Sequence, residues 1–195
     1  MNTKFAVIAS ASFLALAATP AMAEPFSGPY IGIEAGLDSY EVQAGDVFAD
    51  GDHYDGLSGN GVVGALFAGY DLPVSPSTFV GIETKAALSA AEITADTGTD
   101  AFSASAKETF GATARMGAML NDNTGLYARA GWENTRFKLA ADGVSESDRD
   151  DALVLGAGLE TRFGDATSFR VEYTYADYSD FIKNNSVRAG VAYRF

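Results

Sequence analysis

The sequence predicts an all-β fold: an eight-stranded antiparallel up-and-down β-barrel that crosses a membrane. Three observations support this prediction: segments in which every second residue is apolar, connections of alternating length, and an N-terminal leader typical of exported proteins. The alternation is clearest in the last residues, where Val187, Ala189, Val191, Tyr193 and Phe195 are apolar and their neighbours are small or charged. Such a strand turns one face toward an apolar medium and the other toward a polar space.

Residues 1–23 are predicted to be a cleaved signal peptide, which leaves 24–195 as one barrel domain. Lys4 supplies the positive start, residues 5–18 form an apolar stretch too short to span a bilayer, and a small-residue cleavage site ends at Ala23. A retained anchor helix is the less favoured alternative, because no stop-transfer pattern follows. A mature chain that spans a membrane must then be a closed barrel, since lipid leaves no water for unpaired backbone groups.

Composition excludes some classes of function. Removal of Lys4 leaves 26 acidic and 12 basic residues, a net charge of −14, which is the wrong sign for a nucleic-acid binder. The chain contains no cysteine, so its exported form depends on no disulfide.

Period-2 segments place the eight strands in order. They are expected near 28–38, 61–72, 79–89, 108–120, 125–138, 151–163, 168–178 and 185–195. Each has ten residues or slightly more, which is the length that a tilted strand needs to cross a bilayer.

The connections between these segments alternate in length. Short ones, rich in turn residues, are expected at 73–78, 121–124 and 164–167. Longer ones, which carry most of the acidic residues, are expected at 39–60, 90–107, 139–150 and 179–184. This pattern is typical of a barrel with both termini in the periplasm and its long loops outside the cell.

The alternation also predicts what each face carries. Apolar side chains such as Ile31, Ile33 and Leu155 are expected to face lipid, with aromatic residues near the strand ends at the membrane interface. The lumen-facing positions hold a charge network of five acids and seven bases: Glu34, Glu83, Lys85, Arg115, Arg129, Glu133, Glu160, Arg162, Arg170, Glu172, Arg188 and Arg194. Side chains fill the lumen of an eight-stranded barrel, so these charges are expected to pair rather than to form a catalytic cluster.

Two segments repeat one pattern. Residues 30–34 and 79–83 both read aromatic, apolar, Gly, Ile, Glu. A lumen-facing glycine leaves room for a large neighbour, and the glutamate two residues later can meet an interior arginine. The repeat predicts equivalent environments in two strands that run in the same direction.

Five segments carry a family resemblance: 28–32, 67–71, 126–132, 170–173 and 187–195. Together they resemble the small outer-membrane β-barrel family, which includes the membrane domain of OmpA-type proteins and porin-like surface proteins of alphaproteobacteria. The resemblance implies a Gram-negative outer-membrane location and an assembly signal at Tyr193 and Phe195, read by the outer-membrane assembly machinery. OmpA-type proteins often continue into a peptidoglycan-binding domain, but no such anchoring is expected here.

Catalytic and metal-binding alternatives have little support in the sequence. A hydrolase of this size needs a positioned histidine beside a nucleophile, and the single histidine, His53, lies in a predicted loop between Asp52 and Asp55. Residues 46–56 are rich in carboxylates but do not match the EF-hand spacing. We therefore expect no enzyme activity, no cofactor and no specific metal site.

The leading hypothesis is a monomeric structural protein that supports envelope integrity and presents acidic loops. Its expected partners are outer-membrane lipids, including lipopolysaccharide. The alternative is a small-solute porin, although twelve charged side chains compete for a narrow lumen. A third hypothesis, a soluble lipocalin-like carrier, would need an apolar interior, and alternation alone cannot assign inside from outside.

Overall fold

The computed structural model describes residues 25–42, 57–96, 101–141, 144–178 and 182–195. The predicted signal peptide, His53 and the acidic segment 46–56 lie outside the described residues. The strands are β1 (Gly28–Val42), β2 (Leu57–Ser75), β3 (Thr78–Ser89), β4 (Glu92–Asp96), β5 (Ala101–Met119), β6 (Thr124–Ala141), β7 (Val144–Arg162), β8 (Thr167–Asp177) and β9 (Ile182–Arg194). Within these ranges, no helix is long and apolar enough to cross a membrane.

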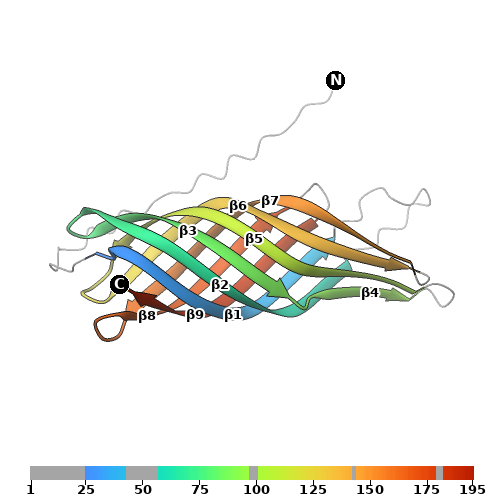
Figure 1. The fold of residues 1–195 in the computed structure, drawn as a ribbon, viewed down its shortest axis with the longest axis horizontal. Coiled ribbons are helices and arrows are strands. Elements are labelled where there is room, and N and C mark those ends of the chain that lie inside the picture. The colour runs from blue at the N-terminus through green and yellow to red at the C-terminus, as the bar shows by residue number, and fades with distance from the viewer. Residues whose placement is uncertain (1–24, 43–56, 97–100, 142–143, 179–181) are drawn as a thin grey trace, which may run out of the picture.

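The strands form a closed antiparallel barrel (Figure 1). Each long strand pairs with its neighbours in the chain, and β1 closes the barrel by pairing with both β2 and β9. The short strand β4 continues the position of β3, since both pair with β5. The barrel therefore has eight strand positions, which confirms the predicted fold class.

Both ends of the described chain lie at one end of the barrel, together with the short connections β2–β3, β5–β6 and β7–β8 (Figure 1). We call this the turn end. In the β5–β6 connection, the side-chain oxygen of Asn121 accepts hydrogen bonds from the backbone N–H groups of Asn123 and Thr124 at 3.0 and 2.9 Å. In the β7–β8 connection, Gly164 has a φ of +76°, a conformation that favours glycine.

The strands extend further at the opposite end than the sequence predicted. Segment 139–150, expected to be a loop, continues β6 to Ala141 and begins β7 at Val144. Segment 90–107 contains β4 and the first residues of β5, and part of segment 39–60 belongs to β1 and β2. These segments are rich in polar and small residues, which is why they resemble loops. Their backbone ladder continues because its hydrogen bonds need no apolar face.

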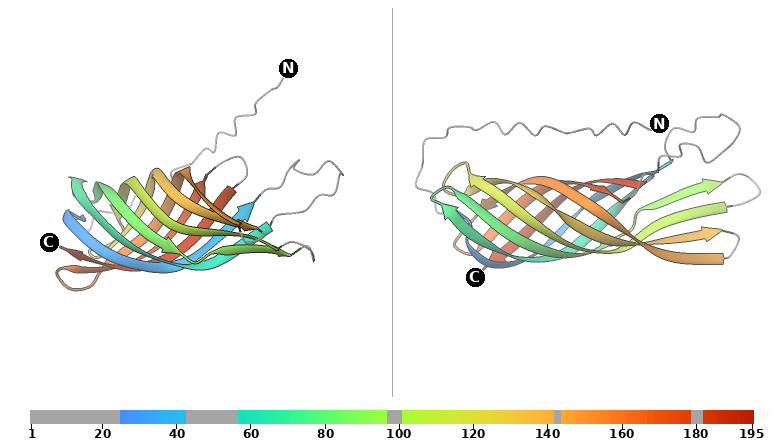
Figure 2. Two further views of the ribbon diagram at one scale, coloured as in Figure 1. Left: turned by 45° about the vertical axis from the view of Figure 1, so that its right-hand side comes forward. Right: turned by 90° about the horizontal axis from the view of Figure 1, so that it is seen from above.

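β4 and the adjoining ends of β5, β6 and β7 continue the sheet beyond the barrel rim (Figure 2). This continuation consists of β4 with residues 101–108, 134–141 and 144–152, and we call it the β4–β7 extension. The pairing of β7 with β8 starts only at Leu153 and Asp177, so the extension has left the closed barrel at that edge.

The two faces of the barrel have opposite character. Large apolar side chains are exposed on the outside, among them Ile33, Ile82 and Leu155, while the charged lumen positions are buried. Val80 and Tyr175, two further residues that the alternation assigns to the lipid-facing side, are half-buried. An apolar exterior around a charged interior is the inverse of a soluble carrier and fits a barrel surrounded by lipid.

Candidate functional site

The candidate site is the charged interior of the barrel. Eleven of the twelve residues predicted to line the lumen are buried, and Arg162 is half-buried at the turn end. Two further buried carboxylates, Asp38 and Asp71, join them. In the described part of the chain, the buried charges are thus seven carboxylates and six cations, a nearly balanced set inside a protein of net charge −13.

The charges nearest the turn end form a ring of four residues: Asp71, Arg115, Glu160 and Arg194. Arg115 contacts both oxygens of Asp71 and lies 2.9 Å from Glu160. Arg194 contacts the same two carboxylates, Asp71 at 2.8 Å and Glu160 at 2.7 Å. The four side chains come from β2, β5, β7 and β9, which are spaced around the barrel. The ring therefore spans the cross-section of the lumen.

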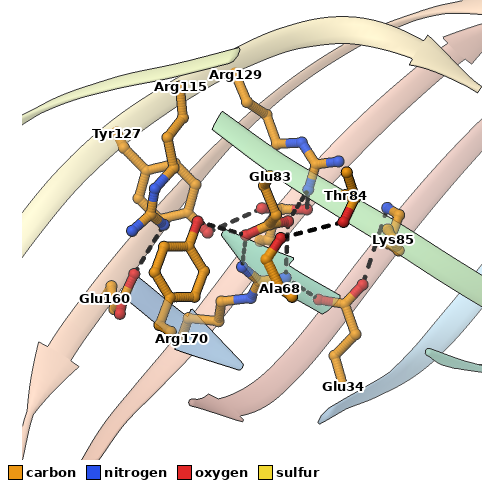
Figure 3. Close-up of polar contacts among 12 residues, drawn as sticks. Glu34, Ala68, Glu83, Thr84, Lys85, Arg115, Tyr127, Arg129, Glu160 and Arg170 are labelled. Atoms are coloured by element: carbon orange, nitrogen blue, oxygen red, sulfur yellow. Dashed lines mark hydrogen bonds and ion pairs between the residues drawn. The ribbon is translucent and has the colours of Figure 1, made fainter. Parts of the chain in front are cut away.

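The next layer centres on Arg170 of β8 (Figure 3). Its guanidinium group binds Glu83 at 2.6 Å and Glu34 at 2.5 Å, and it lies 3.4 Å from the centre of the Phe67 ring. Arg129 binds Glu172 at 2.6 Å and also approaches Glu83 at 3.3 Å. Because Glu83 contacts both arginines, this layer is one connected network.

A third layer lies closer to the extension. Lys85 approaches Glu133 at 3.1 Å and Glu34 at 3.9 Å. Arg188 contacts Asp38 at 3.1 Å and Glu34 at 3.3 Å. Glu34 therefore links this layer to the Arg170 layer.

Aromatic side chains pack inside the lumen at both ends. At the turn end, the buried Phe26 packs edge-on against Phe79 with ring centres 5.2 Å apart, and Arg194 lies 4.4 Å from the Phe26 ring. At the extension end, Phe137 packs against Tyr178 at 5.3 Å and Tyr40 at 5.9 Å. The charged layers therefore lie between two aromatic caps.

Lumen-facing glycines make room for the interior rings. A Cβ atom on Gly32 would lie 2.2 Å from the Phe67 ring, and one on Gly69 would lie 2.3 Å from the Tyr30 hydroxyl. Glu34 and Glu83, the last residues of the two repeated segments, both contact Arg170. The repeated pattern thus places two glutamates on one arginine.

The residues missed by sequence analysis are Asp38 and Asp71. Both follow the inward alternation of their strands, Asp38 after Glu34 and Gly36, and Asp71 after Phe67 and Gly69. Each lies at the edge of its predicted strand, where it resembles a solvated loop residue.

Removing so many charges from water is costly unless each has a partner. Each buried charged side chain named above contacts at least one side chain of opposite charge. Among the residues that the structure describes, no group of three or more His, Cys, Asp or Glu is placed to hold a metal ion. The arrangement can stabilise the barrel interior and occupy its bore.

The two residues expected to act as an assembly signal lie outside this interior. Tyr193 and Phe195 are exposed on the outer wall at the turn end, with ring centres 5.1 Å apart. The backbone N–H of Phe195 donates to the carbonyl of Pro29 at 3.1 Å, so the last residue is held against the start of β1.

An apolar outer wall, a closed antiparallel ladder and a paired charged lumen define a small transmembrane β-barrel. The family model described as "Outer membrane protein beta-barrel domain" matches residues 8–195. The chain therefore belongs to the outer-membrane protein β-barrel family, and it is located in the bacterial outer membrane. In this family the turn end faces the periplasm and the opposite end faces the cell exterior.

Solved barrels of three bacteria share the fold. Neisserial surface protein A (NspA) is 15% identical with a TM-score of 0.61, over 87% of this chain and 98% of that chain. Ail, the attachment invasion locus protein of Yersinia pestis, is 19% identical with a TM-score of 0.53, over 86% and 99%. The N-terminal barrel of Pseudomonas aeruginosa OprF is 10% identical with a TM-score of 0.50, over 87% and 100%. No protein of curated function matches the sequence.

Proposed function

We propose that this protein is a closed, non-catalytic barrel that contributes to the integrity of the outer membrane and presents its extracellular segments at the cell surface. The observation that carries the proposal is the ring of Asp71, Arg115, Glu160 and Arg194. Four strands contribute to it, and direct ion pairs span the lumen there. A solute would have to break several of these pairs to pass.

The aromatic caps support the same conclusion. Phe26 and Phe79 lie on the turn-end side of the ring. Tyr40, Phe137 and Tyr178 lie on the extension side of the charged layers. Both features oppose the passage of ions. Aromatic packing excludes the water that would hydrate an ion, and desolvated ion pairs leave no charged side chain free to bind a passing ion.

Single-channel conductance in a planar bilayer tests the closed state. The refolded mature chain, shown to be folded by a heat-dependent gel shift, is expected to give no unitary steps. The double variant R115A/R194A removes both cations of the ring and serves as the comparison. Current from the folded variant but not from the wild type would support closure by the ring. Regular steps from the wild type would replace the proposal with the small-solute porin.

The role in the envelope needs a separate test in cells. Deletion of the gene is expected to increase sensitivity to bile salts and to large hydrophobic antibiotics, and the wild-type gene is expected to restore resistance. Unchanged sensitivity would contradict a structural role even if the barrel proves closed.

A further inference from the structure

The basic residues of this chain are unevenly distributed. Of its 13 lysines and arginines, seven line the lumen and Lys4 belongs to the predicted leader. Four of the remaining five lie on the outward face of β5, β6 and β7, at the base of the β4–β7 extension: Lys107, Arg136, Lys138 and Arg149. All four are exposed. The fifth, Lys183, lies on β9.

The backbone brings the four cations together. Arg136 of β6 is directly opposite Arg149 of β7, and Lys138 lies two residues further along the same face. The β5–β6 ladder has a bulge between Ala106 and Thr109, so that Lys107 and Glu108 both lie opposite Arg136. A bulge of this kind re-aims side chains, and here it adds a cation to the cluster.

Nearby groups hold the cluster in place without neutralising it. Arg149 donates to the side-chain oxygen of Asn134 at 2.7 Å and lies 5.8 Å from the Phe110 ring. Arg136 approaches Glu108 at 3.7 Å, a pair that is exposed on both sides. Asp151 is bound by the Asn134 amide at 2.8 Å. On the outward face, four cations thus accompany two carboxylates, Glu108 and Asp151. Asp148 and Asp150, which flank Arg149, alternate to the opposite face of β7.

Like charges directly opposite each other in a ladder destabilise a sheet. The Arg136–Arg149 pair therefore favours an external anion between its two guanidinium groups. Arginine suits this role, because its planar fork can bind a phosphate through two parallel hydrogen bonds.

The height of the cluster identifies the source of that anion. Trp132 of β6 is exposed on the outer wall, where a tryptophan is typical of the membrane interface. Arg136 lies four residues beyond it, about 13 Å along a strand that rises about 3.3 Å per residue. With a tilt of about 40°, that is roughly 10 Å of height. The headgroup region extends about 5–7 Å beyond the hydrocarbon on each side. The backbone at Arg136 therefore lies about 3–5 Å beyond the headgroup region. Long arginine and lysine side chains can reach back over that distance to the outer level of the lipid headgroups.

We propose that Lys107, Arg136, Lys138 and Arg149 bind the phosphate groups of lipopolysaccharide in the outer leaflet. Such a contact would anchor the base of the extension. It would also hold an otherwise acidic protein against the anionic surface of the outer leaflet. The proposal rests on the outer-membrane location and orientation, and it does not depend on whether the lumen is closed.

Native mass spectrometry of the folded protein in detergent tests the proposal, with diphosphorylated lipid A as the probe. The variant K107Q/R136Q/K138Q/R149Q is expected to bind this lipid more than about tenfold more weakly, because it loses all four cations that attract the anionic lipid surface. K183Q is the matched control and should bind like the wild type. Lys183 lies opposite Glu41 in one ladder and Asp177 in the other, so nearby acids offset its charge.

Dephosphorylated lipid A is the second probe. It should bind weakly, and the four substitutions should not change its binding. Equal affinity for both lipids, or an unchanged affinity of the quadruple variant, would overturn the proposal. A soluble sulfated oligosaccharide that displaces the lipid and binds more tightly would also overturn it, because the cluster would then serve a ligand from outside the membrane. Heat-dependent gel shifts check that every variant is folded.

Discussion

The hydroxyl group of Tyr30 donates a hydrogen bond of 3.0 Å to Glu83. This bond joins the first residue of one repeated segment, 30–34, to the last residue of the other, 79–83. Arg170 then connects both segments, since it contacts Glu34 and Glu83 together. Three strands that are distant in sequence are thus held by one buried network.

Substitution of Arg170 by methionine is expected to destabilise the barrel strongly. Glu34 and Glu83 would remain buried without their shared cation, and breaking a buried pair in this way costs about 3–5 kcal/mol. Urea unfolding in phosphatidylcholine vesicles, followed by Trp132 fluorescence, measures the change. Arg136→Met is the control, since its exposed pair with Glu108 should contribute less than about 1 kcal/mol. Equal losses in the two variants would contradict the importance of the buried network.

Gly32→Ala is expected to reduce stability although the side chain added is small. The new Cβ would lie 2.2 Å from the Phe67 ring and 2.4 Å from the backbone carbonyl oxygen of Val191, and a backbone atom cannot move aside cheaply. Overpacking of this kind typically costs about 1–3 kcal/mol. Gly64→Ala is the matched control, because a Cβ there meets nothing within 4 Å. The urea midpoint should fall only for Gly32→Ala, and an equal effect at both positions would show that packing against Phe67 is not the cause.

Trp132 provides a test of which face meets lipid, because it is the single tryptophan of the chain. Its side chain is 48% exposed on the outer wall. Its emission in vesicles is expected to be shifted to shorter wavelength and to be quenched by lipids brominated near the headgroup. Aqueous acrylamide should quench it far less than it quenches the urea-unfolded chain. Equally strong acrylamide quenching in both states would contradict the orientation of the outer face.

Phe195→Asp is expected to reduce the amount of folded barrel in the outer membrane of cells. The family resemblance implies that the outer-membrane assembly machinery reads this terminal aromatic residue, and Phe195 is exposed at the turn end. Refolding of the purified variant into detergent should be normal, since its ring closes no part of the lumen. Phe163→Asp changes another exposed aromatic residue at the same end and serves as the control. If both variants assemble equally poorly in cells, the effect comes from the interface and not from a signal.

Much of the barrel could be predicted from sequence because the side chains of a strand alternate between its two faces. The alternation around Arg170 and Glu172 identifies the charged face. The apolar face of the terminal strand indicates that the outside of the barrel contacts a membrane. The strand ends were less predictable. Residues 139–150 have no apolar face, and only the ladder between β6 and β7 shows that they form strands.

The sequence by itself determined the centres of the barrel strands, the alternating faces and the eight positions of the barrel, because these depend on local periodicity and on turn residues. Only the tertiary structure decided which charges meet. Arg170 reaches Glu34 across 136 positions, and Asp71 joins Arg115 and Arg194, because barrel closure and register bring distant strands together. The gathering of Arg136 and Arg149 has the same origin, since it depends on how β6 pairs with β7 and not on any spacing that a strand-by-strand pattern reveals.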